Sequence, residues 1–427
     1  QFARGILNQL DPYSVLLAND IYQEFNINIG GQFAGVGLVV GTRDGQLTVV
    51  APMDGSPAAQ AGMEPLDRIV AVDDEETEHL TLDEILHRLR GETGTPVTLS
   101  VLRKGHAKAL KFELLREEIK VESVETFDLQ SASQTVRYVR IKGFQIATSQ
   151  ELKNKLGDLT GISGLVLDLR NNPGGLLEEA VRVSDLFLPG KQRIVSTKGS
   201  SVSTIHDAKQ LFASPIFQDI PLVVLINRGS ASASEIVAAA LKQNKRAIVI
   251  GEQSFGKGTV QTLWDLKDGS GLKLTIGEYL TPSGLSIHNI GVMPELRLIP
   301  VIVPPIKSQQ GTDDQQQSFS QERFLLLTEE NTENSSVDSE RFELRYLSAK
   351  VAVFDDASLS AEAENLENLN ADIFVETAKR LLLTWNPEEI NSSLQQISRE
   401  VSQQESDKII KALAEHGIDW SLNPFLK

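Results

Sequence analysis

Between residues 164 and 250, short apolar runs alternate with segments whose apolar residues recur at helical spacing. The runs are short and continuously hydrophobic, as in strands that are buried on both faces of a sheet. Strands and helices that alternate in this way join as parallel neighbours through right-handed crossovers. The sequence therefore predicts an α/β core. Its expected elements are strands at 136–141, 164–169, 222–226 and 247–250, and helices at 149–159, 176–186 and 234–243.

Three of these predicted strands are followed directly by a loop rich in glycine or serine. They are the glycine loop (168–175, Asp-Leu-Arg-Asn-Asn-Pro-Gly-Gly), the serine loop (227–235, Asn-Arg-Gly-Ser-Ala-Ser-Ala-Ser-Glu) and the lysine loop (251–258, Gly-Glu-Gln-Ser-Phe-Gly-Lys-Gly). Taken singly, each is also typical of an ordinary turn or helix cap. Ligands of α/β sheets bind at the carboxyl ends of the strands, where such loops meet. Three loops at one sheet edge therefore indicate a site.

The serine loop places its serines on a sharp turn between a buried strand and a helix. A serine on such a turn is exposed at the sheet edge, and the N–H groups that begin the helix can stabilise an oxyanion. The alternative is that these serines only cap the helix, which is a common role of serine. The residues themselves do not choose among Ser230, Ser232 and Ser234.

A nucleophilic serine needs a base, and the six histidines (79, 87, 106, 206, 288 and 416) show no spacing typical of a triad or a metal site. The other option is a lysine kept neutral by burial, because desolvation lowers the pKa of its ammonium group. Lys257 in the lysine loop is the candidate, unless it is a solvated surface charge. This loop has Walker A spacing, but Gly258 replaces the required Ser or Thr and a predicted strand follows. We therefore do not expect nucleotide binding.

Residues 30–120 consist of short β-rich runs separated by Gly, Asp and Pro turns, with one amphipathic helix at 82–90. Within them, Gly35-Val36-Gly37-Leu38 precedes a predicted strand, and residues 56–62 form a predicted short helix. Free N–H groups in a glycine-containing loop beside an unpaired strand edge can hold the carboxylate of a peptide and add the peptide as a further strand. A plain turn of a β domain is the other interpretation.

Composition shifts divide the chain into five expected parts. They are an N-terminal helical segment (1–29), the β-rich domain (30–120), the α/β core (121–306), a polar linker (307–321) and a mostly helical C-terminal module (322–427). Within this module, residues 342–347 and 350–354 are predicted strands, and 371–384 and 387–415 are predicted helices. We expect the module to mediate homo-oligomerisation or to bind an adaptor protein.

Charge and composition exclude several functions. The formal net charge of −17 argues against a nucleic-acid partner, and the absence of cysteine excludes thiol catalysis, thiolate metal sites and disulfides. Cysteine usage fits a cytosol and an oxidising envelope equally well.

No apolar run approaches the roughly 18 residues of a membrane span. The chain begins at Gln1 inside a predicted helix, which leaves room for a removed signal or anchor.

Taken in order, four motifs resemble those of the C-terminal processing peptidases, also called tail-specific or carboxyl-terminal proteases. The motifs are Leu-Asp-Pro-Tyr-Ser (10–14), Gly-Val-Gly-Leu (35–38) with Ser-Pro-Ala-Ala-Gln-Ala-Gly (56–62), Leu-Asp-Leu-Arg-Asn-Asn-Pro-Gly-Gly (167–175), and Ser-Ala-Ser-Ala-Ser-Glu-Ile (230–236) with Phe-Gly-Lys-Gly-Thr-Val-Gln (255–261). The resemblance implies a multi-domain α/β (α+β) fold. In it, a PDZ-like β-rich domain is inserted before an α/β serine protease core with parallel strands, and a helical module follows.

The resemblance also implies roles for individual residues. Ser232 would be the nucleophile, Lys257 the general base, and Gln261 the residue that hydrogen-bonds and orients the lysine. The oxyanion would be held by the backbone N–H of Ala233 and of Gly174 or Gly175. No metal or cofactor is expected.

The PDZ-like domain would dock the C-terminal tail of a protein or peptide substrate and gate access to the dyad. Its peptide-binding residues would be Gly35, Val36, Gly37 and Leu38. Two positions depart from the family pattern, because Leu66 and Asp74 stand where the family usually has glycine.

Two functions remain open at this point. One is a serine endopeptidase of the bacterial periplasm or cell envelope, which cleaves proteins near their C-termini through an acyl-enzyme on Ser232. The other is a scaffold that captures C-terminal tails without cutting them. The combination of Ser232, Lys257 and Gln261 favours the enzyme, because a scaffold has no reason to keep a desolvated lysine. The expected location rests on the resemblance.

Overall fold

The computed structural model describes residues 2–302, 342–348, 369 and 371–414, with short gaps at 8, 44–45, 107, 132–133, 200–202 and 210–214. The chain divides into two compact units. The first takes Gln1–Leu16, Ser123–Asp265 and Leu272–Lys427, and the second takes Leu17–Glu122 and Leu266–Gly271. No helix among the described residues is both long enough and apolar enough to cross a membrane.

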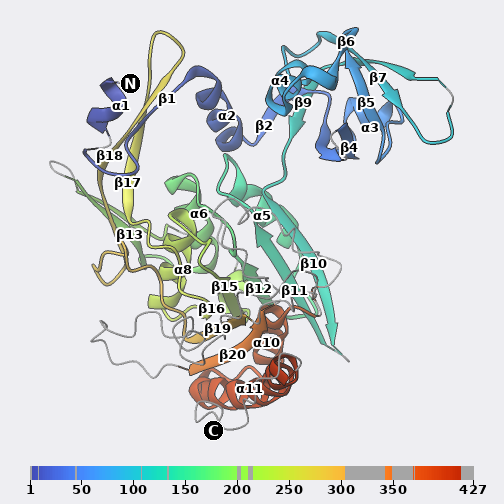
Figure 1. The fold of residues 1–427 in the computed structure, drawn as a ribbon. Helices are drawn as coiled ribbons and strands as arrows, with labels where there is room; N and C mark the ends of the chain where they lie inside the picture. Colours follow the sequence, from blue (N-terminus) through green and yellow to red (C-terminus); the bar gives the residue numbers. More distant parts are fainter. Residues whose placement is uncertain are drawn as a thin grey trace, which may run out of the picture. The chain divides into compact units, whose positions relative to one another are not determined.

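The first unit is built on a seven-stranded sheet with the strand order β10-β11-β12-β15-β16-β19-β20 (Figure 1). β10 runs antiparallel to β11, and all the other neighbours are parallel, as the alternation of strands and helices predicts. The strands are β10 (Val124–Ser131), β11 (Gln134–Ile141), β12 (Ile162–Asp168), β15 (Leu222–Ile226), β16 (Ile248–Gly251), β19 (Leu296–Ile302) and β20 (Phe342–Ser348).

Helices cover both faces of this sheet (Figure 1). Along the fully buried β15, Leu222, Val224 and Ile226 belong to one apolar cluster, whereas Val223 and Leu225 belong to another, because successive side chains of a strand point to opposite faces. The first cluster includes α5 (Thr148–Leu156), α6 (Leu177–Phe187) and α8 (Ala233–Gln243), and the second includes α10 (Ile373–Leu383) and α11 (Ile390–Ala414). The unit also contains α1 (Phe2–Leu7), α7 (Pro215–Asp219) and η3 (Pro387–Glu389).

The C-terminal residues correct one expectation. The predicted strand at 342–347 is β20, but it pairs in parallel with β19 from Leu296↔Phe342 to Ile302↔Ser348, so it belongs to the core sheet. Leu344 of β20 and the apolar faces of α10 and α11 cover the second face of that sheet. These residues are thus part of the first unit and not a separate module, because the buried strands need a helical layer on both faces. The linker at 307–321 and the predicted strand at 350–354 lie outside the described residues.

A second sheet of the first unit has the order β1-β18-β13-β14, with β17 paired to β18. Its strands are β1 (Val15–Leu17), β13 (Arg193–Gly199), β14 (Ser203–Asp207), β17 (Thr259–Asp265) and β18 (Gly271–Leu280). β17 follows the lysine loop directly, as a strand and not the helix that a Walker A loop requires.

The second unit is the β-rich, PDZ-like domain. Its main sheet has the order β3-β4-β5-β7-β8, with β6 on β5, and β2 pairs with β9. Ile85 and Leu89 of the predicted amphipathic helix, α4, are buried in its apolar core. The elements are α2 (Asn19–Gly30), β2 (Gln32–Gly35), β3 (Leu38–Arg43), β4 (Gln46–Pro52), α3 (Pro57–Gln60), β5 (Arg68–Val72), β6 (Glu75–Glu76), η1 (Thr77–His79), α4 (Leu82–Leu89), β7 (Pro96–Leu102), β8 (Leu110–Leu115) and β9 (Glu117–Lys120).

The expected N-terminal segment at 1–29 is divided between the two units, because α2 belongs to the second. Tyr22 of α2 packs directly on Gly271, where an added Cβ would lie 2.4 Å from the tyrosine ring. Leu66 and Asp74 have φ values of +72° and +65°. Glycine adopts such angles without strain, which explains the family's preference for glycine at these two turns.

Candidate active site

The three loops meet at one edge of the sheet, because β12, β15 and β16 are consecutive parallel neighbours. Hydrogen bonds join them. The N–H of Ala231 donates to the carbonyl of Asn172 at 3.0 Å, and the N–H of Phe255 donates to the carbonyl of Ser230 at 3.0 Å. The serine loop is thus held between the glycine loop and the lysine loop.

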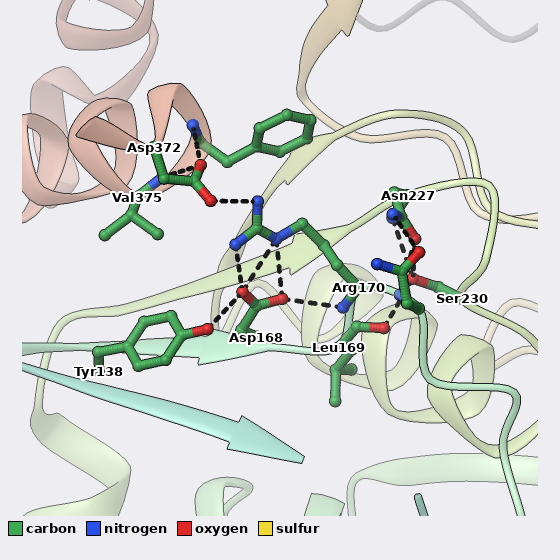
Figure 2. Close-up of polar contacts among 10 residues, drawn as sticks. Tyr138, Asp168, Leu169, Arg170, Asn227, Ser230, Asp372 and Val375 are labelled. Carbon is green, nitrogen blue, oxygen red and sulfur yellow. Dashed lines mark hydrogen bonds and ion pairs between the residues drawn. The ribbon is translucent and has the colours of Figure 1, made fainter. Parts of the chain in front are cut away.

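The three serines of the serine loop differ in what their hydroxyls contact. Ser230 Oγ donates to the Leu169 carbonyl at 2.8 Å and accepts from the N–H of Asn227 at 3.0 Å (Figure 2). Ser234 Oγ donates to the Asn172 carbonyl at 2.9 Å. Both residues are fully buried, whereas Ser232 is 8% exposed. Ser230 and Ser234 therefore have structural roles, and Ser232 is the candidate nucleophile.

Ser232 has an unusual backbone conformation, with φ +54° and ψ −112°. A residue other than glycine in such a region costs about 1–3 kcal/mol, and strain of this kind is typical of the sharp strand-to-helix turn that presents a nucleophile. Tyr279, a buried residue of β18, lies close to Ser232. Burial raises the pKa of Tyr279 to about 12, with Glu178 adding to the effect and Ser232 opposing it, so this phenol stays neutral.

Glu235 connects the serine loop to the lysine loop. Its carboxylate is fully buried and accepts four hydrogen bonds: from the N–H groups of Ser232 (2.8 Å), Gly256 (2.7 Å) and Lys257 (2.8 Å), and from Ser254 Oγ (2.5 Å). Desolvation raises the pKa of Glu235, and the hydrogen bonds act against this. The sequence reasoning did not single out this residue, although Ser232 and Glu235 have the Ser-x-x-Glu spacing of a capping box.

Lys257 is half-buried, and its Nζ lies 5.3 Å from the ring centroid of Tyr13. Burial lowers the pKa of Lys257; the nearby Lys273 lowers it further, and Glu235 acts in the opposite direction. A lysine in this environment has more of the neutral amine that a general base needs.

Tyr13 belongs to the Leu-Asp-Pro-Tyr-Ser motif, whose turn is fixed by Asp11. Asp11 Oδ1 accepts from the N–H of Tyr13 at 2.8 Å and from Thr275 Oγ1 at 2.9 Å. Because Thr275 lies on β18, the motif is fixed to that strand, and the Tyr13 ring faces Lys257. Tyr13 also contacts His288 edge-on, at 6.4 Å between ring centroids.

Gln261 lies on β17, and its Nε2 is buried without a hydrogen-bond partner among the described residues. Lys257 lies in the loop before β17, which begins at Thr259, so the two side chains do not lie on one strand. An orienting contact between Gln261 and Lys257 stays a prediction.

The expected oxyanion residues lie beside the nucleophile turn, with one difference. A Cβ added to Gly174 (φ +101°) would lie 2.7 Å from the Cβ of Ser232 and 3.0 Å from the nitrogen of Ala233, so only glycine allows this approach. However, the N–H of Gly174 donates to Asn172 Oδ1 at 2.9 Å. Ala233 is the first residue of α8, a position whose N–H has no acceptor within the helix. Gly175 packs on Phe144, whose carbonyl oxygen would lie 2.2 Å from an added Cβ.

The expected peptide-binding residues lie in the second unit, where β3 stands at one end of its sheet. One edge of β3 therefore has no partner among the described strands. The carbonyl of Val36 accepts from the N–H of Ala58 at 3.0 Å, and the carbonyl of Gly37 accepts from Met53 at 2.9 Å, so α3 and its flanks fix the loop. A cavity of about 400 Å³ in this unit is lined by residues of α2, β2 and α4, and none of the expected peptide-binding residues lines it.

Comparison with known proteins agrees with this architecture. Residues 135–298 match peptidase family S41, and residues 48–103 match a PDZ domain. The chain is 38% identical over 290 residues to a carboxyl-terminal-processing protease of Synechocystis sp., covering 67% of each chain. It is 39% identical over 300 residues to a carboxy-terminal-processing protease of Bartonella bacilliformis, covering 68% of this chain and 67% of the relative.

A solved structure of a photosystem II D1 C-terminal processing protease is 33% identical, with a TM-score of 0.42, and the match covers 69% of this chain and 80% of that one. The two curated relatives are similar enough over enough of their length to assign the family. The chain therefore belongs to the carboxyl-terminal-processing proteases, serine-type peptidases of family S41 that carry a PDZ domain.

Proposed function

We propose that this peptidase is an endopeptidase that cleaves proteins near their C-termini, with Ser232 as nucleophile and Lys257 as general base. The observation that carries the proposal is the difference among the three serines of the serine loop. The hydroxyls of Ser230 and Ser234 are bound to backbone carbonyls, whereas Ser232 lies on a strained turn. Through Glu235, that turn is bound to the loop of a lysine whose pKa is lowered by burial.

The proposed chemistry has two halves. Ser232 Oγ attacks the carbonyl carbon of the scissile peptide while the neutral amine of Lys257 takes the hydroxyl proton. The C–N bond then breaks, Lys257 protonates the leaving amine, and an acyl-enzyme ester remains. Lys257 next takes a proton from water, which attacks the ester carbonyl; the ester C–O bond then breaks, and Lys257 returns the proton to Ser232 Oγ. Gln261 would orient the amine through both steps.

The oxyanion formed in each half needs backbone donors. The N–H of Ala233 would supply one, and Gly174 or Gly175 the other. In the case of Gly174, the N–H would exchange the Asn172 side chain for the oxyanion.

We further propose that the PDZ-like domain recognises the C-terminal tail of the substrate and gates activity. The support is the edge of β3 that has no partner among the described strands, to which an extended tail can add as a strand. The relatives named above come from bacteria, and we propose the bacterial periplasm or cell envelope as the site of action. Release of the protein by osmotic shock would support a periplasmic location. Its retention in the cytoplasm of spheroplasts would contradict it.

The test is cleavage of an unstructured protein with an apolar C-terminus by the wild type and by Ser232→Ala, with mass spectrometry of the products. We expect cleavage near the C-terminus by the wild type and a loss of at least about 10⁴-fold in the variant. A fluorophosphonate probe should label the peptide that contains Ser232. Undiminished cleavage by Ser232→Ala would contradict the assignment of the nucleophile, and an inert, unlabelled wild type would favour the scaffold.

A further inference from the structure

The C-terminal segment, defined here as the described residues 342–348, 369 and 371–414, contacts two of the three catalytic loops. This segment lies beyond the residues 135–298 that match the peptidase family. Its β20 is the last strand of the sheet, and its two helices α10 and α11 cover the sheet face opposite α8. The contacts are polar and lie at the carboxyl edge of the sheet, where the loops begin.

The first contact joins Asp372 to the glycine loop through Arg170 (Figure 2). Arg170 is 4% exposed and contacts two carboxylates. Its Nη2 donates to Asp168 Oδ2 at 2.6 Å, and its Nη1 donates to Asp372 Oδ2 at 2.8 Å. Tyr138 donates a further hydrogen bond to Asp168 at 2.8 Å. Phe374 of α10 packs against the guanidinium group, which lies 4.8 Å from the centroid of its ring.

The two carboxylate oxygens of Asp372 have different partners. Its Oδ2 faces Arg170, and its Oδ1 accepts from the N–H of Phe374 at 2.9 Å as the N-cap of α10. The start of the helix is therefore fixed to the glycine loop by a residue that the helix itself requires. A buried guanidinium that loses one of its carboxylates is strongly destabilised, so the position of Arg170 depends on Asp372.

The second contact reaches the lysine loop. Tyr346 of β20 donates from its hydroxyl to Glu252 Oε1 at 3.0 Å, and Glu252 Oε2 lies 3.7 Å from Nε of Arg228 in the serine loop. Tyr346 also packs edge-on against Phe374, at 5.4 Å between ring centroids. Tyr346 and Asp372 thus belong to one cluster that contacts all three loops, directly or through one intermediate residue.

We propose that Asp372 and Tyr346 are positioning residues for catalysis, and that the C-terminal segment acts as an internal clamp on the catalytic loops. Asp372 holds Arg170, and four residues further along the same loop Gly174 packs against the nucleophile turn. A loop that is free to shift at Arg170 no longer fixes the oxyanion donors beside Ser232. Small displacements of such donors are costly for the chemical step. This inference rests on the proposed role of the loops in catalysis.

The test compares Asp372→Asn with Glu376→Gln in the full-length protein. Asparagine is a good N-cap, so the first variant keeps α10 while it removes the anion that faces Arg170. The matched control changes an acid to its amide on the same helix. Glu376 pairs with Lys379 and Arg380 of α10 itself. Melting temperature, kcat and KM are measured for both, together with amide hydrogen exchange of residues 169–175.

We expect Asp372→Asn to lower kcat about tenfold with KM changed less than about twofold, because the lost contact acts on the transition state. Exchange in the glycine loop should become faster. Glu376→Gln should keep wild-type kcat and exchange, and Asp372→Glu should recover part of the loss. Tyr346→Phe should lower kcat less than Asp372→Asn.

If Asp372→Asn keeps the wild-type kcat and the wild-type hydrogen exchange of the glycine loop, the proposed clamp is wrong. Equal losses in Asp372→Asn and Glu376→Gln, in proportion to their melting temperatures, would also overturn it, because they would show only a general loss of stability. If the wild type cleaves no substrate, the proposed function fails. The exchange measurement still tests the clamp in that case.

Discussion

We compare two edges: the proposed catalytic edge of the first unit, where the glycine, serine and lysine loops meet, and the β3 edge of the second unit. Both expose backbone N–H and carbonyl groups that helices and strands leave unpaired, but the two edges differ in how many of these groups are hydrogen-bonded. At the catalytic edge, the three loops are bound to one another, and Glu235 alone accepts four hydrogen bonds there. At the β3 edge, the loop carbonyls of Val36 and Gly37 are fixed from one side, and no strand in the described part of the chain pairs with the outer edge. Bond-breaking needs groups held in place before the substrate arrives, whereas strand addition needs free backbone groups.

The largest effect should come from the catalytic edge. Lys257→Ala removes the proposed base, and we expect kcat to fall by about 10⁴-fold while binding of the substrate tail is unchanged. In the wild type, activity should rise with pH through the pKa of Lys257, which burial lowers, because only the neutral amine accepts the proton. The measurement is the pH profile of kcat/KM.

His288 provides the control for this assignment, because it contacts Tyr13, which lies over Lys257. His288→Gln should keep the wild-type pH profile. A profile that titrates near the ordinary histidine pKa of about 6.5 and disappears in this variant would show that the base is a histidine.

Local patterns were sufficient to predict much of the fold. The predicted strand at 222–226 has the observed bounds of β15, because a continuous apolar run between turn residues is a strong local signal. The attachment of β20 to β19 was not predictable in this way. Parallel pairing joins segments that are far apart in sequence, and the polar linker between them indicated a boundary instead.

In the candidate site, too, some features follow from local sequence patterns and others only from the fold. Sequence spacing placed the three loops at one edge and selected Lys257, but it could not choose among the serines. What distinguishes Ser232 is that the hydroxyls of Ser230 and Ser234 bind carbonyls of the glycine loop, about 60 residues earlier in the chain. Glu235 carried a local signal, the capping-box spacing, yet two of its donors are backbone groups of the lysine loop that only the fold brings near.

A smaller effect is expected from charges around the base. Glu235 raises the pKa of Lys257 and Lys273 lowers it, so removal of each charge should shift the acidic limb of the kcat/KM profile in opposite directions. Glu235→Gln should move the limb to lower pH, and Lys273→Met should move it to higher pH. Glu235→Gln should also lower kcat about tenfold or more, because an amide cannot accept from all four donors.

These opposite shifts separate an electrostatic effect on Lys257 from a loss of structure. A variant that is only less stable loses activity across the whole pH range and keeps the position of the limb. If both variants shift the limb in the same direction, or neither shifts it, Lys257 is not the group that titrates. The catalytic edge would then need another base.

The smallest effect should come from the β3 edge. Amidation of the substrate C-terminus removes the carboxylate, and we expect KM to rise roughly tenfold, because the tail then docks less tightly on the PDZ-like domain. The preference for the free acid should be lost in Gly37→Ala, because the added Cβ would lie 2.2 Å from the Cβ of Ser56.

Gly55→Ala is the matched control for Gly37→Ala. Both glycines have a φ of +70°, so both variants bear the same backbone strain, but no heavy atom lies within 4 Å of a Cβ added at Gly55. Gly55→Ala should therefore keep the preference for the free acid. Equal KM values for free and amidated substrates in the wild type would contradict the proposal that the Gly35–Leu38 loop recognises the substrate carboxylate. In that case the contrast between the two edges would reduce to a catalytic site and a strand edge without an assigned ligand.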